Sequence, residues 1–172
     1  STSGRFPDGL GNDSGLLGKY VPFHNYRARM SAQYEGFKEF TTDRKRPTYA
    51  YIPRFRNVYK QDTDFLRGYA ATFSSGRWQY NNSKGLFGEE LLKSLHAEPE
   101  WGDWSVGAQM MGETIPKESN FVALDKTKQD AWGIPLLKIS IDYDDNDEKM
   151  ISDFTDQMSE MFTKAGFKNI KT

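Results

Sequence analysis

The chain contains only two histidines, the side chains best suited to act as a general base near neutral pH. His24 lies near the start of a predicted strand, between Phe23 and Asn25, and His96 follows a predicted short helix. Neither has a serine or an acidic residue at a spacing that indicates a catalytic triad. We therefore expect both histidines to be structural or surface residues, and the sequence predicts no complete active site.

Arginines are the other candidates for chemistry, because several lie within predicted strands among aromatic residues: Arg27, Arg29, Arg54, Arg56 and Arg67. Guanidinium groups that donate to hydroxyls, beside aromatic rings that stack on a sugar, would suit a carbohydrate-binding cavity. The same residues could equally form an exposed sheet face on which arginine stems cover apolar surface. Both interpretations remain open from the residues alone.

Two short motifs resemble ligand-binding loops but are incomplete. Residues 9–15 (GLGNDSG) have a serine where a dinucleotide-binding loop has its third glycine, and no predicted strand precedes them. Residues 142–148 (DYDDNDE) lack the glycine and the distal glutamate of a calcium loop. We expect no cofactor-binding or metal-binding residues in this chain.

Composition indicates one folded domain of 172 residues with an aromatic core, since 15% of the residues are aromatic. Residues 1–19 are expected to be an irregular connector, and residues 20–172 the domain itself. A net charge of −1 does not favour nucleic acid or an anionic membrane. The absence of cysteine excludes disulfides and thiolate catalysis, the apolar runs are too short to span a membrane, and the compartment stays open.

Hydrophobic periodicity predicts an α+β fold, with a mostly antiparallel sheet of about six strands flanked by helices. In the clearest strand, polar residues such as Arg29, Ser31 and Gln33 alternate with apolar ones. The predicted strands are residues 26–35, 48–55, 65–73, 104–112, 120–124 and 136–143. Residues 41–47 are expected to form a charged loop, residues 74–85 a turn-rich segment and residues 89–95 a short helix.

An amphipathic helix is predicted near the C-terminus from apolar residues at helical spacing: Ile151, Phe154, Met158, Met161, Phe162 and Ala165. Asp145, with Glu148 three residues later, is expected to cap its start. Gly166 is expected to end it in a left-handed conformation, and residues 167–172 to begin a strand. Residues 119–143 are predicted to form a hairpin in which Trp132 anchors the turn.

Several stretches, in this order, resemble the glucose–methanol–choline family of flavin-dependent oxidoreductases, in particular its branch of pyranose oxidases and sugar dehydrogenases. The segments that carry the resemblance are FPDGLGNDSGLLGKY followed by HNYR (6–27), YIPRFRN (51–57), FLRGY (65–69), GETIPKESNFVALD (112–125) and DAWGIP (130–135). Asp13, Lys19 and Phe23 depart from the family pattern.

The resemblance implies that this chain is the substrate-binding domain of an FAD-dependent enzyme that oxidises a sugar or polyol. It implies a flavin-binding glycine motif before Ser1 and a catalytic histidine after Thr172, so the segment alone is expected to be inactive and to bind no FAD. It implies substrate contacts on the strand 67–73, chiefly from Tyr69 and Phe73, with Arg67, Arg27 and Arg54 as further candidates.

A second hypothesis is a standalone carbohydrate- or protein-binding module without catalytic activity, which the aromatic content and the arginines on strands support. In the first hypothesis the partners are the small-molecule substrate and the missing flavin domain of the same polypeptide. A sheet edge left open by a missing neighbouring strand would also favour a homodimer.

Overall fold

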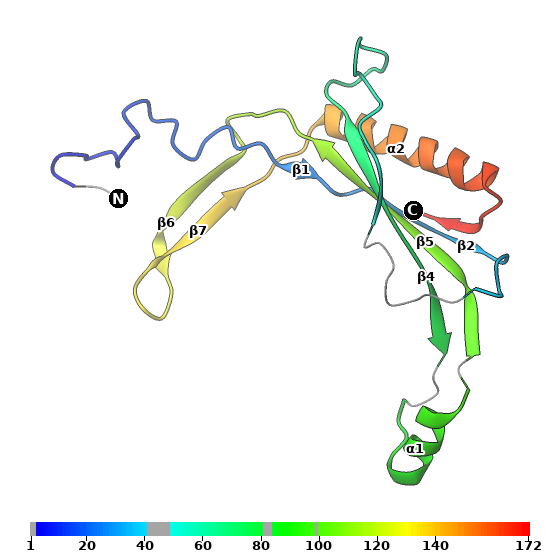
Figure 1. Cartoon of the computed structure of the whole chain (residues 1–172). Helices are drawn as coiled ribbons and strands as arrows, with labels where there is room; N and C mark the ends of the chain where they lie inside the picture. Colours follow the sequence, from blue (N-terminus) through cyan, green and yellow to red (C-terminus); the bar gives the residue numbers. More distant parts are fainter. Residues whose placement is uncertain (1–2, 41–48, 81–83, 99) are drawn as a thin grey trace. The chain divides into compact units, whose positions relative to one another are not determined.

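The computed structural model describes residues 3–40, 49–80, 84–98 and 100–172 (Figure 1). The chain divides into two compact units, which we call the first and the second unit. The first comprises Ser1–Asn25, Arg56–Gly68 and Gly112–Met150, and the second comprises Tyr26–Phe55, Tyr69–Met111 and Ile151–Thr172. The predicted loop at 41–47 lies outside the described residues.

The described elements confirm the predicted α+β class, with antiparallel pairing between the strands. In chain order they are β1 (His24–Asn25), β2 (Arg29–Tyr34), β3 (Ala50–Ile52), β4 (Tyr69–Tyr80), α1 (Gly88–His96), β5 (Glu100–Glu113), β6 (Phe121–Gln129), β7 (Pro135–Ser140), α2 (Asp145–Lys164) and β8 (Lys168–Lys171). Six strands form one sheet in the order β3-β4-β5-β2-β8, with β1 paired to β5, while β6 and β7 form a separate two-stranded sheet.

Strict alternation on the central strands gives the sheet of the second unit two different faces. On β5, Val106, Ala108 and Met110 are buried, and on β2 the buried residues are Met30 and Ala32. Because side chains point alternately to opposite faces of a strand, these residues share one face of the sheet. That face is the core, and the intervening polar residues are left on the other face.

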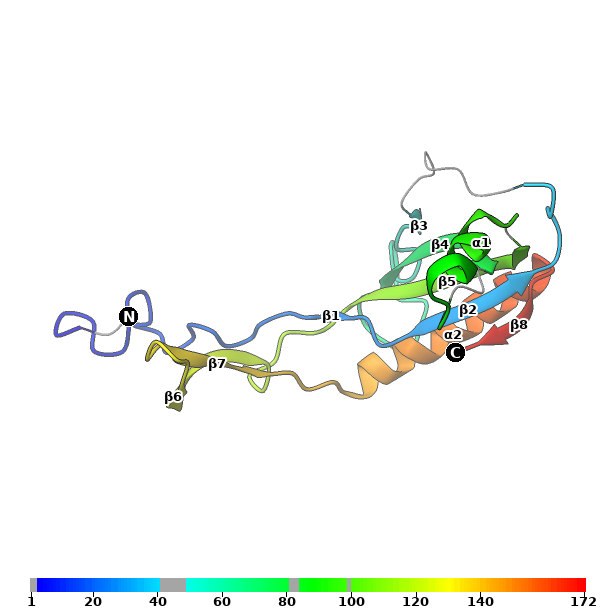
Figure 2. The ribbon, with the colours of Figure 1, turned by 90° about the horizontal axis from the view of Figure 1, so that it is seen from below.

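Helix α2 covers the core face, and it lies along the sheet in Figure 2. The ring of Phe154 meets that of Tyr69 edge to face at 5.5 Å, and the ring of Phe162 meets that of Phe73 at 6.5 Å. The Tyr69 hydroxyl donates to the Asp153 carboxylate at 2.6 Å, which satisfies the one polar atom of a buried ring. Of the apolar stripe predicted from helical spacing, Phe154, Met158 and Phe162 are confirmed in the core, whereas Ala165 is exposed.

The start of α2 is capped one residue earlier than the sequence predicts. The Asp144 carboxylate, not that of Asp145, accepts from the N–H groups of Asn146 and Asp147 at 3.1 and 3.3 Å. The Asp147 carboxylate accepts in return from the Asp144 N–H at 3.1 Å, which completes a capping box. Asp145 instead extends into solvent and pairs with Lys149 at 2.9 Å.

The end of α2 follows the prediction. Gly166 has φ +79°, and its N–H donates to the Thr163 carbonyl. The Phe167 N–H donates to the Phe162 carbonyl at 2.9 Å, and the two rings lie 5.5 Å apart. Both hydrogen bonds and the ring contact belong to the Schellman motif, which turns the chain back so that β8 pairs with β2.

Three predictions about local structure are wrong. Residues 74–80 continue β4 instead of forming turns, because the glycine and serines there fit beside the small residues of β5. The strand predicted from residue 65 begins only at Tyr69. Trp132 does not anchor its turn, since 85% of its surface is exposed; the Asp130 carboxylate holds the turn by accepting from the N–H groups of Trp132 and Ile134, both at 2.9 Å.

Within the described residues, none of the helices is both long enough and apolar enough to cross a membrane. This finding agrees with the short apolar runs of the sequence.

The capping box leads to a testable prediction. Asp144→Ala removes the acceptor for two helix N–H groups and one partner of Lys117, so we expect a loss of about 1–2 kcal/mol in the free energy of unfolding. Asp145→Ala is the matched control and should cost at most about 0.5 kcal/mol, because its ion pair is exposed. Urea unfolding of both variants would measure the difference, and equal losses would contradict the assignment of the cap.

The same comparison has a pH dependence. Burial opposes ionisation of Asp144, but hydrogen bonds from Lys117 and the Asp147 N–H outweigh it and lower the pKa of this carboxyl from its ordinary value of 3.8. Stability contributed by a carboxylate with a lowered pKa is present above the unfolded value and is lost as the pH falls through the folded one. The gap between wild type and Asp144→Ala should therefore be full above about pH 4 and close in stronger acid.

Candidate functional site

The sheet face opposite α2 carries small and polar side chains in rows across three strands. Antiparallel register places Arg29 opposite Gln109, Ser31 opposite Gly107, and Gln33 opposite Ser105. Residues directly opposite one another on paired strands have side chains on the same face, so these six residues lie on one face of the sheet. We call this surface of the second unit the open face.

Strand β4 extends each row by one residue. The Thr72 hydroxyl lies 3.4 Å from the Gln109 carbonyl oxygen, and the Ser105 hydroxyl donates to the Gly76 carbonyl at 3.1 Å. A Cβ added at Gly107 would lie 3.6 Å from the Ser74 hydroxyl, and Ser31 is the residue opposite Gly107 on β2. Because Gly107 has no side chain, only backbone atoms of β5 lie between Ser74 and Ser31. The open face is therefore a shallow platform of hydroxyl, amide and guanidinium groups.

A hollow of about 470 Å³ lies on this platform, within the size range of small-molecule sites. Its lining residues come from β2, β4 and β5, and they are Ser31, Ser74, Ser75, Gly76, Arg77, Trp78, Ser105, Val106 and Gly107. Serine hydroxyls both donate and accept hydrogen bonds, which is the combination that a ligand with several hydroxyl groups requires. Trp78 is 72% exposed and adds an aromatic wall.

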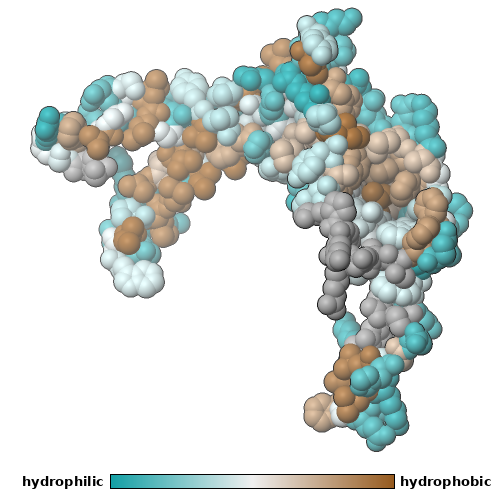
Figure 3. Space-filling view, in the orientation of Figure 1, coloured by the Kyte–Doolittle hydropathy of each residue, from teal (hydrophilic) through white to brown (hydrophobic). Residues whose placement is uncertain are grey.

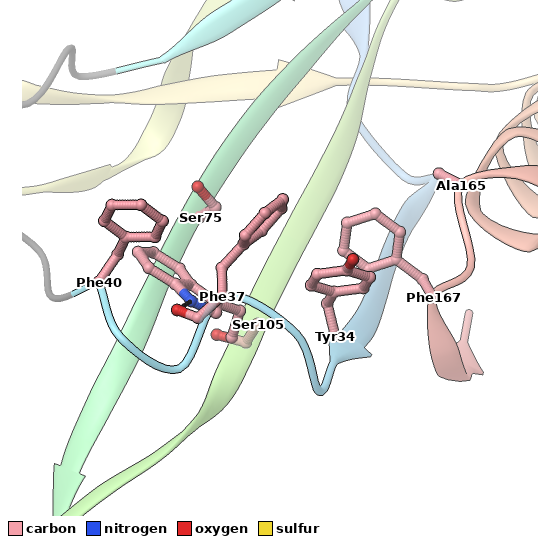
Figure 4. Close-up of a pocket in the computed structure, with 8 residues that line it drawn as sticks. Tyr34, Phe37, Phe40, Ser75, Ser105, Ala165 and Phe167 are labelled. Atoms are coloured by element: carbon pink, nitrogen blue, oxygen red, sulfur yellow. Dashed lines mark hydrogen bonds between the residues drawn. The ribbon is translucent and has the colours of Figure 1, made fainter.

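A second hollow of about 510 Å³ has mostly aromatic walls (Figure 4). Its lining residues are Tyr34, Phe37, Phe40, Ser75, Trp104, Ser105, Ala165 and Phe167. The Tyr34 ring lies between those of Phe37 and Phe167, at 5.5 and 5.4 Å. Ser75 and Ser105 line both hollows, but Tyr34 and Trp104 continue the alternation of the buried residues of β2 and β5, so the aromatic hollow lies on the core side of the sheet.

Arg77 holds the walls of both hollows in place. Its guanidinium donates to the carbonyls of Gly102, Lys38 and Phe40 at 2.8, 2.7 and 2.8 Å, and lies 5.8 Å from the Trp101 ring centre. A planar fork of N–H donors is suited to several carbonyls at once. Arg77 thus ties β4 to β5 and to the segment that carries Phe37 and Phe40, a positioning role that the sequence did not reveal.

The residues that the family resemblance suggested as substrate contacts are distributed over both units. Tyr69 is buried and Phe73 packs on Phe162, so both lie on the core face and not on the open face. Arg67 belongs to the first unit, where its guanidinium is 4.0 Å from the Glu113 carboxylate. Arg27 and Arg54 belong to the second unit and are exposed.

The two histidines belong to different units. His24 forms part of β1, opposite Glu113 in the first unit, and His96 is the exposed last residue of α1 in the second. No three histidine, aspartate or glutamate side chains in the described part of the chain are grouped so that they could hold a metal ion. The residues that line the two hollows include no histidine, aspartate or glutamate.

Residues 9–15 do not fit a dinucleotide. They form a succession of turns, in which Gly9, Gly11 and Gly15 all have positive φ, and neither a strand before them nor a helix after them completes a phosphate cradle. That this segment does not bind FAD stays a prediction.

Several groups with shifted pKa values lie at the start of α2, in the first unit. Burial raises the pKa of Asp147, which is 2% exposed. Burial acts against ionisation of Lys117 as well, but its hydrogen bonds and charge contacts with Asp144 and Asp142 outweigh it and raise its pKa. These groups cap and anchor a helix, so the shifts are those of a structural network.

The sequence is similar to that of a known dehydrogenase. The chain is 28% identical over 154 residues to the 2-methyl-1,2-propanediol dehydrogenase of Mycolicibacterium austroafricanum. The match covers 82% of this chain and 26% of that protein, so the chain spans about a quarter of the length of the curated relative. No family model matches the sequence. The similarity relates this chain to an oxidoreductase.

The role of Arg77 can be tested directly. Arg77→Met keeps most of the apolar stem but removes the hydrogen bonds to the carbonyls of Gly102, Lys38, Phe40 and Trp101, so we expect the free energy of unfolding to fall by about 1–3 kcal/mol. Urea unfolding followed by tryptophan fluorescence would also report on Trp101 and Trp104. Arg29→Met, on the exposed open face, is the control and should change stability by no more than about 0.5 kcal/mol.

Proposed function

We propose that this chain is the substrate-binding segment of an FAD-dependent oxidoreductase of the glucose–methanol–choline type that acts on an alcohol group of a sugar or polyol. The observation that carries the proposal is a hydroxyl-lined hollow on the open face of a chain that is similar to a diol dehydrogenase. The ordered sequence motifs supply further support for the family.

The open face offers what such a substrate needs. Arg29 has donors only, Gln109 has both a donor and an acceptor, and the hydroxyls of Ser31 and Ser74 can serve in either way. A polyol with adjacent hydroxyls would be held at two or more points, which fixes the orientation of the carbon to be oxidised. Trp78 would lie against the C–H surface of the substrate.

The chemistry itself would lie elsewhere in the protein. Hydride acceptance is what a flavin supplies in such enzymes, and alcohol oxidation also requires a base for the hydroxyl proton. The described residues offer neither a dinucleotide cradle nor a base beside the hollows. The task of this segment is therefore to bind and orient the substrate.

A second candidate function, a binding module without catalysis, is favoured by the aromatic hollow of Tyr34, Phe37, Phe40, Trp104 and Phe167. Aromatic walls bind the apolar faces of sugars or the side chains of a protein partner. The two functions differ in what they require, because only the enzyme needs a flavin in the complete protein.

The proposal predicts a specific kinetic change. In the complete protein that contains this segment, Gln109→Leu should raise KM for polyol substrates about tenfold, the equivalent of one lost hydrogen bond, and leave kcat nearly unchanged. Steady-state kinetics with an artificial electron acceptor would measure both constants across a panel of diols and sugars.

Lys128→Ala, at the exposed end of β6 in the first unit, is the matched control and should not alter KM. Wild-type KM values for both Gln109→Leu and Ser31→Val would show that the open face is not the binding surface. A complete protein without flavin absorbance, which nevertheless binds sugars in calorimetry, would favour the binding module.

A further inference from the structure

The hairpin of β6 and β7, in the first unit, exposes an aliphatic face that nothing among the described residues covers. The register pairs Val122 with Ile139 and Leu124 with Leu137, so these four side chains lie on the same face. Leu124, Leu137 and Ile139 are 62%, 59% and 54% exposed. Figure 3 shows hydrophobic surface over this hairpin. We call these four residues the hairpin face.

The opposite side of the hairpin is mixed: the register places Phe121, Ala123 and Lys138 there, and Leu136, on the same side of β7, is 42% exposed. There the Lys138 ammonium group lies 5.7 Å from the ring centre of Phe121, so a charged side chain screens the one aromatic residue. A hairpin whose two sides both carry apolar side chains, one of them wholly aliphatic, is typical of a strand pair that rests on another layer of protein.

The hairpin is well defined although its aliphatic face is uncovered. At the tip, the Asp130 carboxylate accepts from two backbone N–H groups, and the Asp125 carboxylate accepts from the Thr127 and Lys128 N–H groups at 2.8 and 3.0 Å. At the base, the Asn120 side chain accepts from the Asp142 N–H at 2.7 Å, and the Val122 N–H donates to the Gly18 carbonyl at 2.7 Å. The hairpin face is thus presented on a fixed backbone.

A two-stranded hairpin is marginally stable in water unless a further layer packs on it. Three aliphatic side chains that are more than half exposed on one such hairpin therefore indicate a missing layer. A second copy of the chain could supply it, but the similarity to the longer dehydrogenase points to a nearer source, because almost three-quarters of that protein lies outside the matched region.

We propose that the hairpin face packs against a part of the same polypeptide outside these 172 residues, and that the hairpin thereby joins the substrate-binding segment to the remainder of the enzyme. The inference rests on the proposed function for the existence of that remainder. It goes beyond it by naming the surface through which the two parts are held together.

Photo-crosslinking of the complete protein tests this inference. Benzoylphenylalanine is placed at Leu137 in a mixture of isotopically light and heavy protein, and the products are mapped by mass spectrometry. We expect crosslinks within one chain, to residues outside the segment, and far fewer of them from Lys138 on the opposite side. Crosslinks between light and heavy chains, no crosslinks, or a coding sequence without further residues would each overturn the inference.

A smaller substitution guards against misfolding caused by the bulky probe. In the native complete protein, Leu137→Cys should react with a maleimide at least tenfold more slowly than Lys138→Cys, and the two rates should become equal in urea. Equal rates in the native protein would overturn the inference. Neither the crosslinking nor the maleimide reaction requires a substrate. A protein that is inactive on polyols would refute the proposed function, and it would not change the result of either docking experiment.

Discussion

The two-faced character of β5 is the constraint on which the second unit depends. Val106, Ala108 and Met110 are buried beneath α2, while Ser105, Gly107 and Gln109 alternate with them on the open face. A shift of one residue in the register between β2 and β5 would turn the polar set into the core and expose the apolar set. The candidate site and the hydrophobic core are therefore fixed by the same backbone hydrogen bonds, and neither can change its register without the other.

Much of the fold could be predicted because its signals are local. The alternation on β2 and the apolar stripe of α2 depend only on the periods of strands and helices, and both are confirmed. The hairpin of β6 and β7 was also predicted, but not its separation from the main sheet. Strand order depends on contacts between distant residues, and β8, the partner of β2 at one sheet edge, is such a case.

The candidate site was harder to predict, for a physical reason. Tyr69 and Phe73 were candidates because large aromatic side chains can stack on ligands. The same large apolar area also favours their burial in a hydrophobic core. The open face consists of serines, glycines and a glutamine, residues that sequence patterns assign to solvent or turns. The alternation did separate Ser31, Ser105, Gly107 and Gln109 from their apolar neighbours; only the pairing of β2 with β5 shows that they meet.

The sheet of the second unit and the hairpin of the first unit differ in whether their aliphatic face is covered. In the second unit α2 covers the aliphatic face of the sheet, and the face left open is polar. In the first unit the exposed face of the hairpin is the aliphatic one, carried by Leu124, Leu137 and Ile139. A polar open face is stable in water and suits a dissolved ligand, whereas an aliphatic open face is stable only against protein. The same argument supports both proposals, a substrate at the open face and a neighbouring layer of the polypeptide at the hairpin face.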